Sequence, residues 1–316
     1  MSATLAATAI IPVFNAEDYI ARAIRSVLEQ TMPAEEILVV DDGSTDNSAH
    51  VVSQFGSKVR YLYQINAGAS AARNLAIREA RSEWVAFLDA DDVWKPDRLE
   101  RQFEVLNRNP DIRWAAGSFN NISGGRVDSI PKTRFSHKLV ENNVASDALE
   151  LMGNGWSIWT GTVIVRRDVF AEVGDFDEGQ RTGHDLDLWI RIAAKHPRIG
   201  WINDPVADYE INPDGLTLTS VTNGDPTLIR LHERALKITD ELSTERKPHL
   251  RSFTEIHGQL VLRDTISAGR TAQARKLIGQ FDELGVPVSS KLKFASWLPG
   301  RLITTLRSGK QFFLGR

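Results

Sequence analysis

The first third of this chain alternates short apolar segments with amphipathic ones, and that alternation limits the fold more than any other feature. Four apolar runs are too short for helices and are predicted to be strands, at 7–13, 36–40, 59–63 and 84–88. Apolar residues at helical spacing follow these runs and predict helices at 17–30, from Thr45 or Asp46 to Phe55, 69–80 and 96–107. The repeated strand–helix order predicts an α/β fold with a doubly wound, mostly parallel sheet of the Rossmann-like type.

Polar residues gather where three of the predicted strands end. Asn15 follows the first strand, Asp41-Asp42-Gly43-Ser44-Thr45-Asp46 follows the second, and Asp89-Ala90-Asp91-Asp92 follows the fourth. Ligands of open α/β sheets bind outside the carboxyl ends of the strands, so these clusters mark the expected site. Solvated turn residues that cap the following helices are the alternative, most of all for Asp46.

The acidic clusters also predict a cation. Crowded carboxylates repel one another, and a divalent ion relieves that repulsion. The chain has no cysteine, so the donors on offer are oxygens, which suit Mn²⁺ or Mg²⁺. Because these ions commonly bridge carboxylates to substrate phosphates, the expected ligand is a nucleotide diphosphate.

Composition argues against several other classes of protein. The 316 residues include 38 basic and 41 acidic side chains, and the net charge of -3 argues against a general grip on nucleic acid. The absence of cysteine excludes disulfides and a cysteine nucleophile. No basic residue precedes the first apolar run, and no run approaches the ~18 apolar residues of a membrane-spanning helix. We therefore expect a cytoplasmic protein that is soluble or peripheral.

The remainder of the chain is predicted to be mixed and then helical. Between residues 112 and 214 we expect strands at 112–119 and 160–165, a loop or flap at 120–143 and a helix at 186–194. Farther on, apolar residues recur at three-four spacing, first through 228–242 and again through 274–281. The expected organisation is an α/β ligand-binding and catalytic domain at 1–215, followed by a helical region at 216–316.

Four segments resemble, in order, the motifs of family 2 glycosyltransferases. They are Ile11-Pro12-Val13-Phe14-Asn15, Val39-Val40-Asp41-Asp42-Gly43-Ser44-Thr45-Asp46, Asn66-Ala67-Gly68-Ala69-Ser70-Ala71-Ala72-Arg73-Asn74 and Phe87-Leu88-Asp89-Ala90-Asp91-Asp92. A later segment, 173–189, is similar to the acceptor-side motif of the same family. The resemblance implies the GT-A fold, a nucleotide-sugar donor and an inverting mechanism. It does not reach the C-terminal helical region.

The resemblance also implies donor contacts. Asp42 would accept a hydrogen bond from the N–H of uracil, which favours a UDP-sugar and leaves a guanine nucleotide open, and Arg73 would steady the base or the phosphates. The segment from Asp89 to Asp92 resembles the DxD motif. Within it, Asp91 is expected on the ribose, and Asp92 or Asp91 itself on the metal. The full set of expected nucleotide-binding residues is Pro12, Val13, Asn15, Glu17, Asp41, Asp42, Gly68, Arg73, Asp89 and Asp91.

On the acceptor side, Asp185 matches the family's catalytic base. It would take the proton of an acceptor hydroxyl that attacks the anomeric carbon from the face opposite the nucleotide, with one inversion. Helical spacing points Asp187 away from Asp185. The family usually has Glu where this chain has His184, so we expect His184 to meet a different acceptor, together with Trp156. A packed surface histidine and a metal ligand are the alternatives for His184.

These expectations describe the transfer of a sugar to a saccharide or lipid-linked saccharide acceptor, in the synthesis of a surface polysaccharide or glycolipid. Transfer to a polyprenyl phosphate and a catalytically inactive GT-A scaffold are the alternatives. The segment after the first strand, Asn15-Ala16-Glu17-Asp18, contains no glycine. That argues against a nucleotidyltransferase and against the G-x-G-x-x-G loop of a dehydrogenase.

The C-terminal tail has a composition of its own. No acidic residue follows Glu283, whereas six basic residues are interleaved with tryptophan, phenylalanine and leucine. Such a segment is typical of an interfacial amphipathic element, and Pro299-Gly300 divides it. We therefore expect a peripheral membrane contact through 287–316, on the inner face of the cytoplasmic membrane. Docking on the catalytic domain or on the partner in a homodimer is the alternative.

Overall fold

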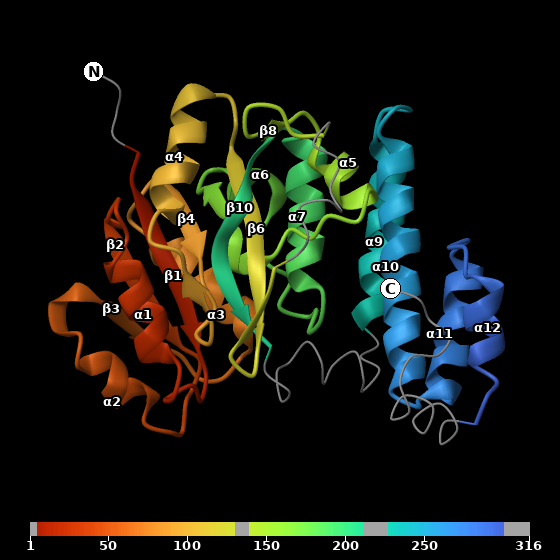
Figure 1. Ribbon diagram of the computed structural model, residues 1–316, viewed down its shortest axis with the longest axis horizontal. Coiled ribbons are helices and arrows are strands. Elements are labelled where there is room, and N and C mark those ends of the chain that lie inside the picture. The colour runs from red at the N-terminus through yellow and green to blue at the C-terminus, as the bar shows by residue number, and fades with distance from the viewer. Residues whose placement is uncertain (1–4, 130–138, 212–226, 300–316) are drawn as a thin grey trace. The chain divides into compact units, whose positions relative to one another are not determined.

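The computed structural model describes residues 5–129, 139–211 and 227–299, which Figure 1 shows in colour. The chain divides into two compact units. Unit 1 comprises the described residues of Met1–Leu151, Trp156–Glu178 and His184–Asn212. Unit 2 comprises those of Met152–Gly155, Gly179–Gly183 and Pro213–Arg316.

A mixed sheet forms the centre of unit 1. Within the described residues it has ten strands, in the order β3-β2-β1-β4-β9-β6-β10-β5, with β7 paired to β6 and β8 to β10. The strands are β1 (Ala7–Val13), β2 (Glu36–Asp41), β3 (Arg60–Tyr63), β4 (Trp84–Phe87), β5 (Val93–Trp94), β6 (Trp114–Ser123), β7 (Arg126–Ser129), β8 (Val144–Ala145), β9 (Ile164–Arg166) and β10 (Ile199–Glu210).

The predicted sheet, doubly wound and mostly parallel, is confirmed. β1 pairs in parallel with β2 and β4, β2 pairs in parallel with β3, and β6 pairs in parallel with β10. The short β9 runs antiparallel to both β4 and β6, so those two long-range neighbours point the same way. The carboxyl ends of β1, β2, β4, β6 and β10 therefore lie at one edge of the sheet, where the polar clusters were expected.

Seven α-helices of the described chain accompany this sheet. They are α1 (Ile20–Leu28), α2 (Ser48–Ser53), α3 (Ala69–Glu79), α4 (Arg98–Arg108), α5 (Ala148–Gly153), α6 (Val169–Val173) and α7 (His184–Lys195). Helix α3 packs on β1 and β2, whereas α4 packs on β6 and β10. Helix α1 forms because Ile20, Ala23, Ile24 and Val27 recur at helical spacing, and all four are buried.

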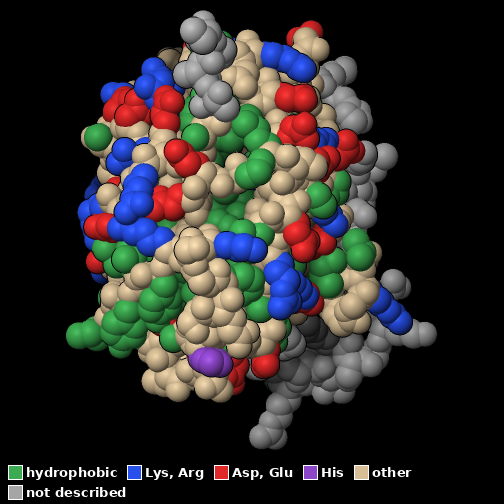
Figure 2. Space-filling view, turned by 90° about the vertical axis from the view of Figure 1, so that its left-hand side faces the viewer, with side chains coloured by type: hydrophobic (Ala, Val, Ile, Leu, Met, Phe, Trp, Pro, Cys, Tyr) green, Lys and Arg blue, Asp and Glu red, His purple; other side chains and the backbone are tan. Residues whose placement is uncertain are grey.

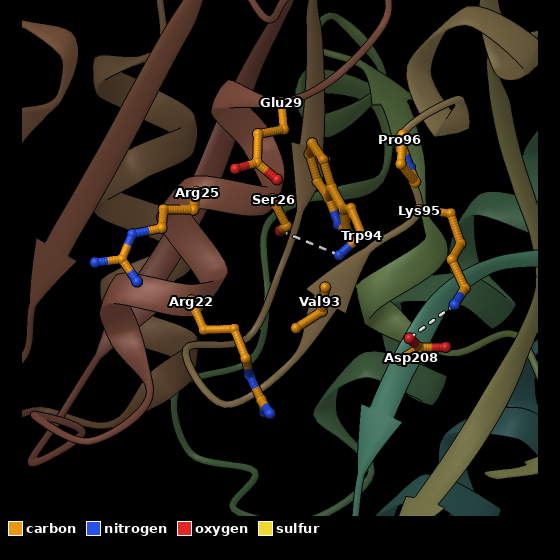
Figure 3. A pocket seen from close by; sticks show the side chains of 9 residues that line it. All are labelled: Arg22, Arg25, Ser26, Glu29, Val93, Trp94, Lys95, Pro96 and Asp208. Atoms are coloured by element: carbon orange, nitrogen blue, oxygen red, sulfur yellow. Dashed lines mark hydrogen bonds and ion pairs between the residues drawn. The ribbon is translucent and has the colours of Figure 1, made fainter.

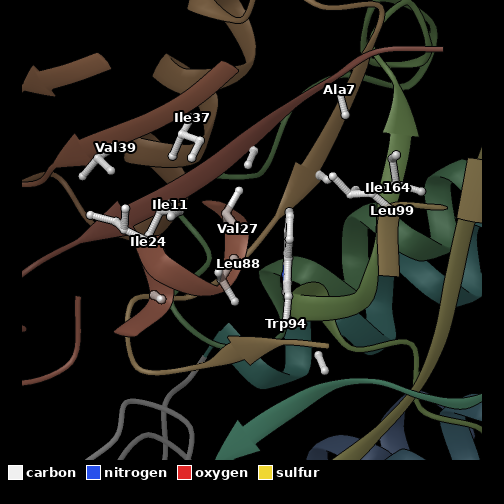
Figure 4. Close-up of a cluster of buried hydrophobic side chains, with 14 of the residues drawn as sticks. Ala7, Ile11, Ile24, Val27, Ile37, Val39, Leu88, Trp94, Leu99 and Ile164 are labelled. Carbon is white, nitrogen blue, oxygen red and sulfur yellow. The ribbon is translucent and has the colours of Figure 1, made fainter. Parts of the chain in front are cut away.

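The core of unit 1 joins α1 to the sheet. Figure 4 shows Ile24 and Val27 of α1 beside Ile11 of β1 and Leu88, with Trp94 farther along the same cluster. These side chains are all at most 2% exposed. Because Leu88 immediately precedes Asp89, the buried core holds the acidic segment at a fixed point of the sheet edge.

Figure 2 shows another face of unit 1, on which positive and negative side chains are intermixed and hydrophobic side chains gather between them. The large hydrophobic residues exposed on the edge strand β3 and just after it are Tyr61, Tyr63 and Ile65. Edge strands leave backbone groups unpaired. Of these three residues, Tyr61 also takes part in the candidate site described below.

Several predicted elements differ from the structure. The strand expected at 160–165 begins instead as a 3₁₀ turn, Thr160–Thr162, and only Ile164–Arg166 is extended. The loop expected at 120–143 starts as a hairpin, because β6 continues to Ser123 and pairs with β7. Its residues 130–138 lie outside the described chain. The helix expected from residue 96 begins at Arg98, and the helix expected at 17–30 begins at Ile20.

Unit 2 is helical, as the apolar spacing predicted. Its helices are α9 (Thr227–Glu241), α10 (Lys247–Ser267), α11 (Thr271–Glu283) and α12 (Ser290–Ala295). Leu228, Leu262, Ala274 and Phe281 lie in its core and are at most 1% exposed. In the part of the chain that the structure describes, no helix is both long and apolar enough to cross a bilayer.

Candidate functional site

The loops after β1 and β2 are tied together at the edge of the sheet. Val13 lies opposite Asp41 in the parallel register, which brings Pro12 and Val13 beside the acidic loop. The side chain of Asn15 accepts a 2.8 Å hydrogen bond from Thr45 N, and the carboxylate of Glu17 accepts one from Asn47 N at 2.9 Å. Asn15 and Glu17 therefore hold the acidic loop in place by accepting hydrogen bonds from its backbone.

Asp46 lies one residue before Asn47, the N-cap of α2, and its carboxylate contacts the start of that helix. Its carboxylate accepts hydrogen bonds from Ser48 N, the first residue of α2, and from Glu17 N. Burial is the largest single influence on the pKa of Asp46 and raises it. The hydrogen bonds from Ser48 and Glu17 together outweigh burial, so the pKa is lowered. Thr45 contacts Asn15 rather than the helix.

Asp41 and Asp42 are both buried, and each carboxylate already has protein donors. Asp41 accepts from Ser44 N and from the hydroxyl of Tyr61, each at 2.7 Å. Burial of the Tyr61 phenol and its bond to Asp41 raise the pKa of Tyr61. Asp41, the last residue of β2, is therefore joined to the neighbouring strand β3 through the side chain of Tyr61.

The carboxylate of Asp42 fixes the loop that leads into α3. Three donors reach it: Gln64 Nε2 at 2.7 Å, and the backbone N–H groups of Ala67 and Gly68 at 2.8 Å each. Gly68 has φ +95°, a left-handed conformation that glycine adopts without strain. Two of these donors reach Oδ1 and one reaches Oδ2, so the carboxylate still has acceptor capacity for the N–H of a base. The contact between Asp42 and a base stays a prediction.

Arg73 joins the two sides of the candidate site. It projects from α3, is 5% exposed, forms an ion pair with Asp89, and donates through Nη1 to His184 Nε2 at 2.8 Å. Its guanidinium carbon lies 5.5 Å from the ring centre of Phe176. The Nε of Arg73 is buried and has no partner among the described residues. Arg73 thus joins Asp89 of one motif to His184 of another.

The acidic segment after β4 carries charge that burial disfavours. Burial, and then the charge of Asp89, raise the pKa of Asp91 to about 6. Asp92 is 1% exposed, and burial followed by the charges of Asp89 and Asp91 raises the pKa of its carboxyl well above the usual range. Asp92 Oδ1 accepts from Glu210 N at 2.8 Å, whereas Oδ2 has no partner among the described residues.

These carboxylates fit a divalent cation. An orphaned buried oxygen on Asp92 and a carboxyl on Asp91 that resists ionisation are what a positive ion would satisfy. Within the described residues, no three side chains of His, Asp or Glu converge on one point. Mn²⁺ or Mg²⁺ bound through two carboxylates would therefore complete its coordination with phosphate oxygens and water.

Asp185 and Asp187 have different surroundings at the start of α7. The half-buried carboxylate of Asp185 accepts from Thr160 Oγ1 at 3.1 Å and from Leu186 N at 2.9 Å. Asp187 is 1% exposed and forms an ion pair with Arg191 at 2.9 Å. The predicted difference between the two acids thus agrees with their surroundings, since Asp187 supports the helix while Asp185 stays partly open.

Trp156, the other residue expected on the acceptor side, is buried in unit 1. It is 5% exposed and packs edge-to-face on Trp201, with ring centres 5.0 Å apart. Its contribution to an acceptor site stays a prediction. Sequence reasoning missed Tyr61, Gln64 and Thr160, whose side chains hold the acids. Their position is the only sequence feature that could have pointed to them: Tyr61 lies in the strand predicted at 59–63, Gln64 follows that strand, and Thr160 begins the strand predicted at 160–165.

A pocket of about 350 Å³ lies next to the acidic segment (Figure 3). Arg22 lines it and donates to the carbonyl of Asp91 at 2.7 Å and to Glu210 at 3.1 Å. Across the pocket, Lys95 forms a 2.8 Å ion pair with Asp208, which Figure 3 marks with a dashed line. Arg22 and Lys95 are thus each paired with a carboxylate, so the pocket does not form an open anion site. Arg22 instead holds the backbone of the acidic segment. The full lining is Arg22, Arg25, Ser26, Glu29, Val93, Trp94, Lys95, Pro96 and Asp208.

Comparison with known proteins gives this geometry a context. Residues 8–174 match the family model described as glycosyl transferase family 2. The chain is 34% identical over 206 residues to the Bacillus subtilis protein named putative teichuronic acid biosynthesis glycosyltransferase TuaG, covering 64% of this chain and 77% of that protein. It is 32% identical over 187 residues to the uncharacterized glycosyltransferase RP339 of Rickettsia prowazekii, covering 58% of this chain and 57% of that protein.

Two solved structures share the fold. Residues 1–349 of S. aureus TarS in complex with UDP-GlcNAc align with a TM-score of 0.72 and 19% identity, covering 98% of this chain and 93% of that one. The mannosyltransferase PcManGT from Pyrobaculum calidifontis, in complex with GDP-Man and Mn²⁺, aligns with a TM-score of 0.62 and 17% identity, covering 97% of this chain and 87% of that one. At these identities the likeness concerns the fold alone, and it confirms the predicted GT-A fold.

Proposed function

Because this chain belongs to glycosyl transferase family 2, it is a glycosyltransferase, and we propose that it moves a sugar from a nucleotide-diphosphate sugar to an acceptor hydroxyl with inversion. The observation that carries the proposal is the position of Arg73, which contacts both Asp89 and His184, the neighbour of Asp185. A donor held near Asp89 would thereby lie close to the general base.

The donor side is assigned to the edge formed by β1, β2 and β4. Pro12, Val13, Asn15, Glu17, Asp41, Asp42 and Gly68 are proposed to line the nucleoside position, and Asp91 to contact the ribose. Arg73 would steady the base or the phosphates, with Asp89 paired to it. A UDP-sugar is the first expectation, and a solved neighbour of similar fold contains UDP-GlcNAc. Another contains GDP-Man, so a guanine donor belongs in the same test.

Asp91 and Asp92 would hold the Mn²⁺ or Mg²⁺ ion. Bound there, the cation would offset the charge of the leaving diphosphate. Burial and neighbouring charge raise the pKa of Asp91 to about 6, and one buried oxygen of Asp92 has no partner among the described residues, so both groups favour a nearby positive charge. That preference supports the assignment of the pair as ligands rather than as ordinary turn residues.

Asp185 is the proposed general base. Thr160 donates to one of its oxygens and Leu186 N to the other, which fixes the plane of the carboxylate. In the proposed step the acceptor oxygen forms a bond to the anomeric carbon as the bond from that carbon to the diphosphate oxygen breaks. Asp185 takes the hydroxyl proton, and the nucleoside diphosphate leaves with the electron pair. One displacement inverts the anomeric carbon, and base catalysis of this kind typically contributes ~10²–10⁴-fold.

The proposed acceptor is a saccharide or lipid-linked saccharide of a surface polysaccharide or glycolipid. The curated relative TuaG is named for teichuronic acid biosynthesis, a process of that kind. We assign catalysis to 1–215 and propose that the tail at 287–316 of the helical region contacts the inner face of the cytoplasmic membrane; its residues 300–316 lie outside the described chain. On and just after α12, Phe294 is 70% exposed and Trp297 is 75% exposed, beside Lys291 and Lys293. A homodimer partner is the alternative cover for these two rings.

The test is a nucleotide screen on the full chain. UDP- and GDP-sugars are added with and without Mn²⁺, and the midpoint of thermal unfolding is measured. At about 100 times the dissociation constant a bound donor stabilises the fold by ~2.7 kcal/mol, which raises the midpoint by several degrees. The correct donor should do so only with the metal, and should release its sugar to water or to an acceptor glycan. A chain that no nucleotide sugar stabilises at millimolar concentration would contradict the proposal.

A further inference from the structure

The contact between Arg73 and His184 fixes the protonation state of the histidine. A guanidinium has only N–H donors and no acceptor, so His184 Nε2 must supply the lone pair for the 2.8 Å hydrogen bond. The ring is then neutral and carries its proton on Nδ1. A second proton on Nε2 would place two positive N–H groups against each other at that distance.

This geometry also limits what His184 does in the site. The lone pair that accepts from Arg73 is the one that a metal would need, so Nε2 does not ligate a cation while this bond exists. Phe176 packs against the ring, with ring centres 6.0 Å apart, and also lies near the guanidinium of Arg73. The imidazole is therefore held by a hydrogen bond and by an aromatic neighbour.

His184 is the first residue of α7 and directly precedes Asp185. Two side-chain contacts thus orient the first turn of α7: Arg73 through His184, and Thr160 through Asp185. Arg73 is in turn fixed by Asp89, and α3, which carries Arg73, starts at the loop held by Asp42. A continuous set of contacts runs from the proposed donor loops to the proposed base.

We infer that His184 is a positioning residue: as a neutral hydrogen-bond acceptor for Arg73, it sets the orientation of Asp185 relative to the donor-side acid Asp89. The inference rests on the proposed function for its consequence in turnover, but not for the tautomer that it assigns. Removal of the acceptor atom loosens α7 and impairs the chemical step, while the nucleotide-binding loops keep their own contacts.

The tautomer is tested without substrate. In the full chain labelled with ¹⁵N-histidine, the His184→Gln variant identifies the His184 resonances among those of the seven histidines. At neutral pH we expect a proton on Nδ1 and none on Nε2, and we expect Arg73→Lys to change that spectrum because lysine lacks the planar fork that reaches two partners. A proton on Nε2, or a His184 spectrum that is indifferent to Arg73→Lys, would overturn the inference.

The positioning role is tested by kinetics with three variants of matched size or chemistry. His184→Leu should lower kcat about tenfold or more and change the donor KM by less than about twofold, because a hydrogen bond to a charged partner is lost. His184→Gln offers an amide oxygen to Arg73 and should recover most of kcat. The exposed His50→Gln on α2 is the control and should match the wild type. Full kcat in His184→Leu, or equal loss in His184→Leu and His184→Gln, would also overturn it.

The two arms separate the inference from the proposed function. A wild-type chain that transfers sugar from no donor contradicts the proposed function, and the tautomer measurement then decides the inference alone.

Discussion

The backbone N–H of Glu210 donates a 2.8 Å hydrogen bond to Oδ1 of Asp92, across 118 positions of sequence. This bond, from the end of β10, fixes one oxygen of a carboxylate whose other oxygen has no partner among the described residues. Asp92 is therefore oriented but not satisfied. The pKa of Asp91 is also raised, to about 6, so the fold disfavours the charged form of both carboxyls.

The first prediction concerns the carboxyls of Asp91 and Asp92. Replacing Asp91 and Asp92 with Asn should abolish Mn²⁺-dependent binding of a nucleoside diphosphate, measured by calorimetry. The same change should raise the unfolding midpoint of the ligand-free chain at pH 7 by about 2–5 °C, because two carboxylates that resist ionisation are gone. Asp97→Asn, at an exposed position near the start of α4, is the control. Retained metal dependence in the double variant would show that other residues hold the cation.

The second prediction concerns the two acids of α7. Asp185→Asn should leave donor affinity and unfolding midpoint near those of the wild type and lower turnover by at least about a hundredfold. Asp187→Asn should instead destabilise the chain by about 2–4 kcal/mol, because it breaks a buried ion pair with Arg191. Steady-state kinetics and thermal unfolding of both variants separate these effects. Asp185 is not the base if its Asn variant turns over at the wild-type rate with saturating acceptor.

The first third of the fold was predictable from sequence because its periodicity is local. Ile20, Ala23, Ile24 and Val27 repeat at helical spacing, and the structure buries all four. Strand β10 was not predicted, because Asn203-Asp204-Pro205 interrupts its apolar pattern, and the structure accommodates them as an irregularity between Ile202 and Ala207. Local periodicity carries no information on such a bulge.

The candidate site was predictable as a set of acids but not as a network. The resemblance to known motifs singled out Asp89 and Asp185. Nothing in the sequence predicts the contact between Arg73 and His184, which lie 111 positions apart. The same holds for Tyr61, which donates to Asp41 only because β3 pairs beside β2. Contacts of this kind depend on the register of the sheet, and a single sequence does not specify that register.

The third prediction concerns pH and the histidine pair of unit 2. The carbonyl of Leu228 accepts from His232 Nδ1, so His232 Nε2 is free to accept from His257 Nδ1 at 3.3 Å. Burial lowers the pKa of His232 to about 4, and burial together with the charge of His232 lowers that of His257 to about 3. Both rings are thus neutral in the folded chain.

The sign of the pH effect follows from these lowered values. The unfolded histidines take up protons below about pH 6.5 while the folded ones do not, so stability falls as the pH drops from 6.5 towards 4. We expect a loss on the order of 6 kcal/mol at pH 4, about half from each ring, that His257→Gln reduces and the exposed His50→Gln does not. Circular dichroism of thermal unfolding between pH 4 and 7 measures it. Identical pH profiles for the wild type and His257→Gln would show that the pair does not titrate on unfolding.

The fourth prediction concerns the membrane. Among the described residues of unit 2, Trp297 and Phe294 are the most exposed large aromatic side chains, and Arg275 lies 4.9 Å from the ring centre of Trp297. The chain that follows Glu283 adds six basic residues and no acidic one. Basic residues near an anionic leaflet contribute about 1 kcal/mol each, and aromatic rings suit the interface. The full chain should therefore sediment with anionic vesicles at low salt and much less at high salt.

The paired variant Phe294→Ala/Trp297→Ala should lose most of this vesicle binding, because the basic residues alone do not bury apolar surface in the interface. Leu260→Ala removes an exposed apolar side chain of α10, 41% exposed, and is the control that should still bind. Both chains should keep the wild-type unfolding midpoint. If the paired variant and the wild type sediment equally, the two rings have another partner, and a shift of the wild type alone to a dimer on gel filtration would identify that partner as a second copy of the chain.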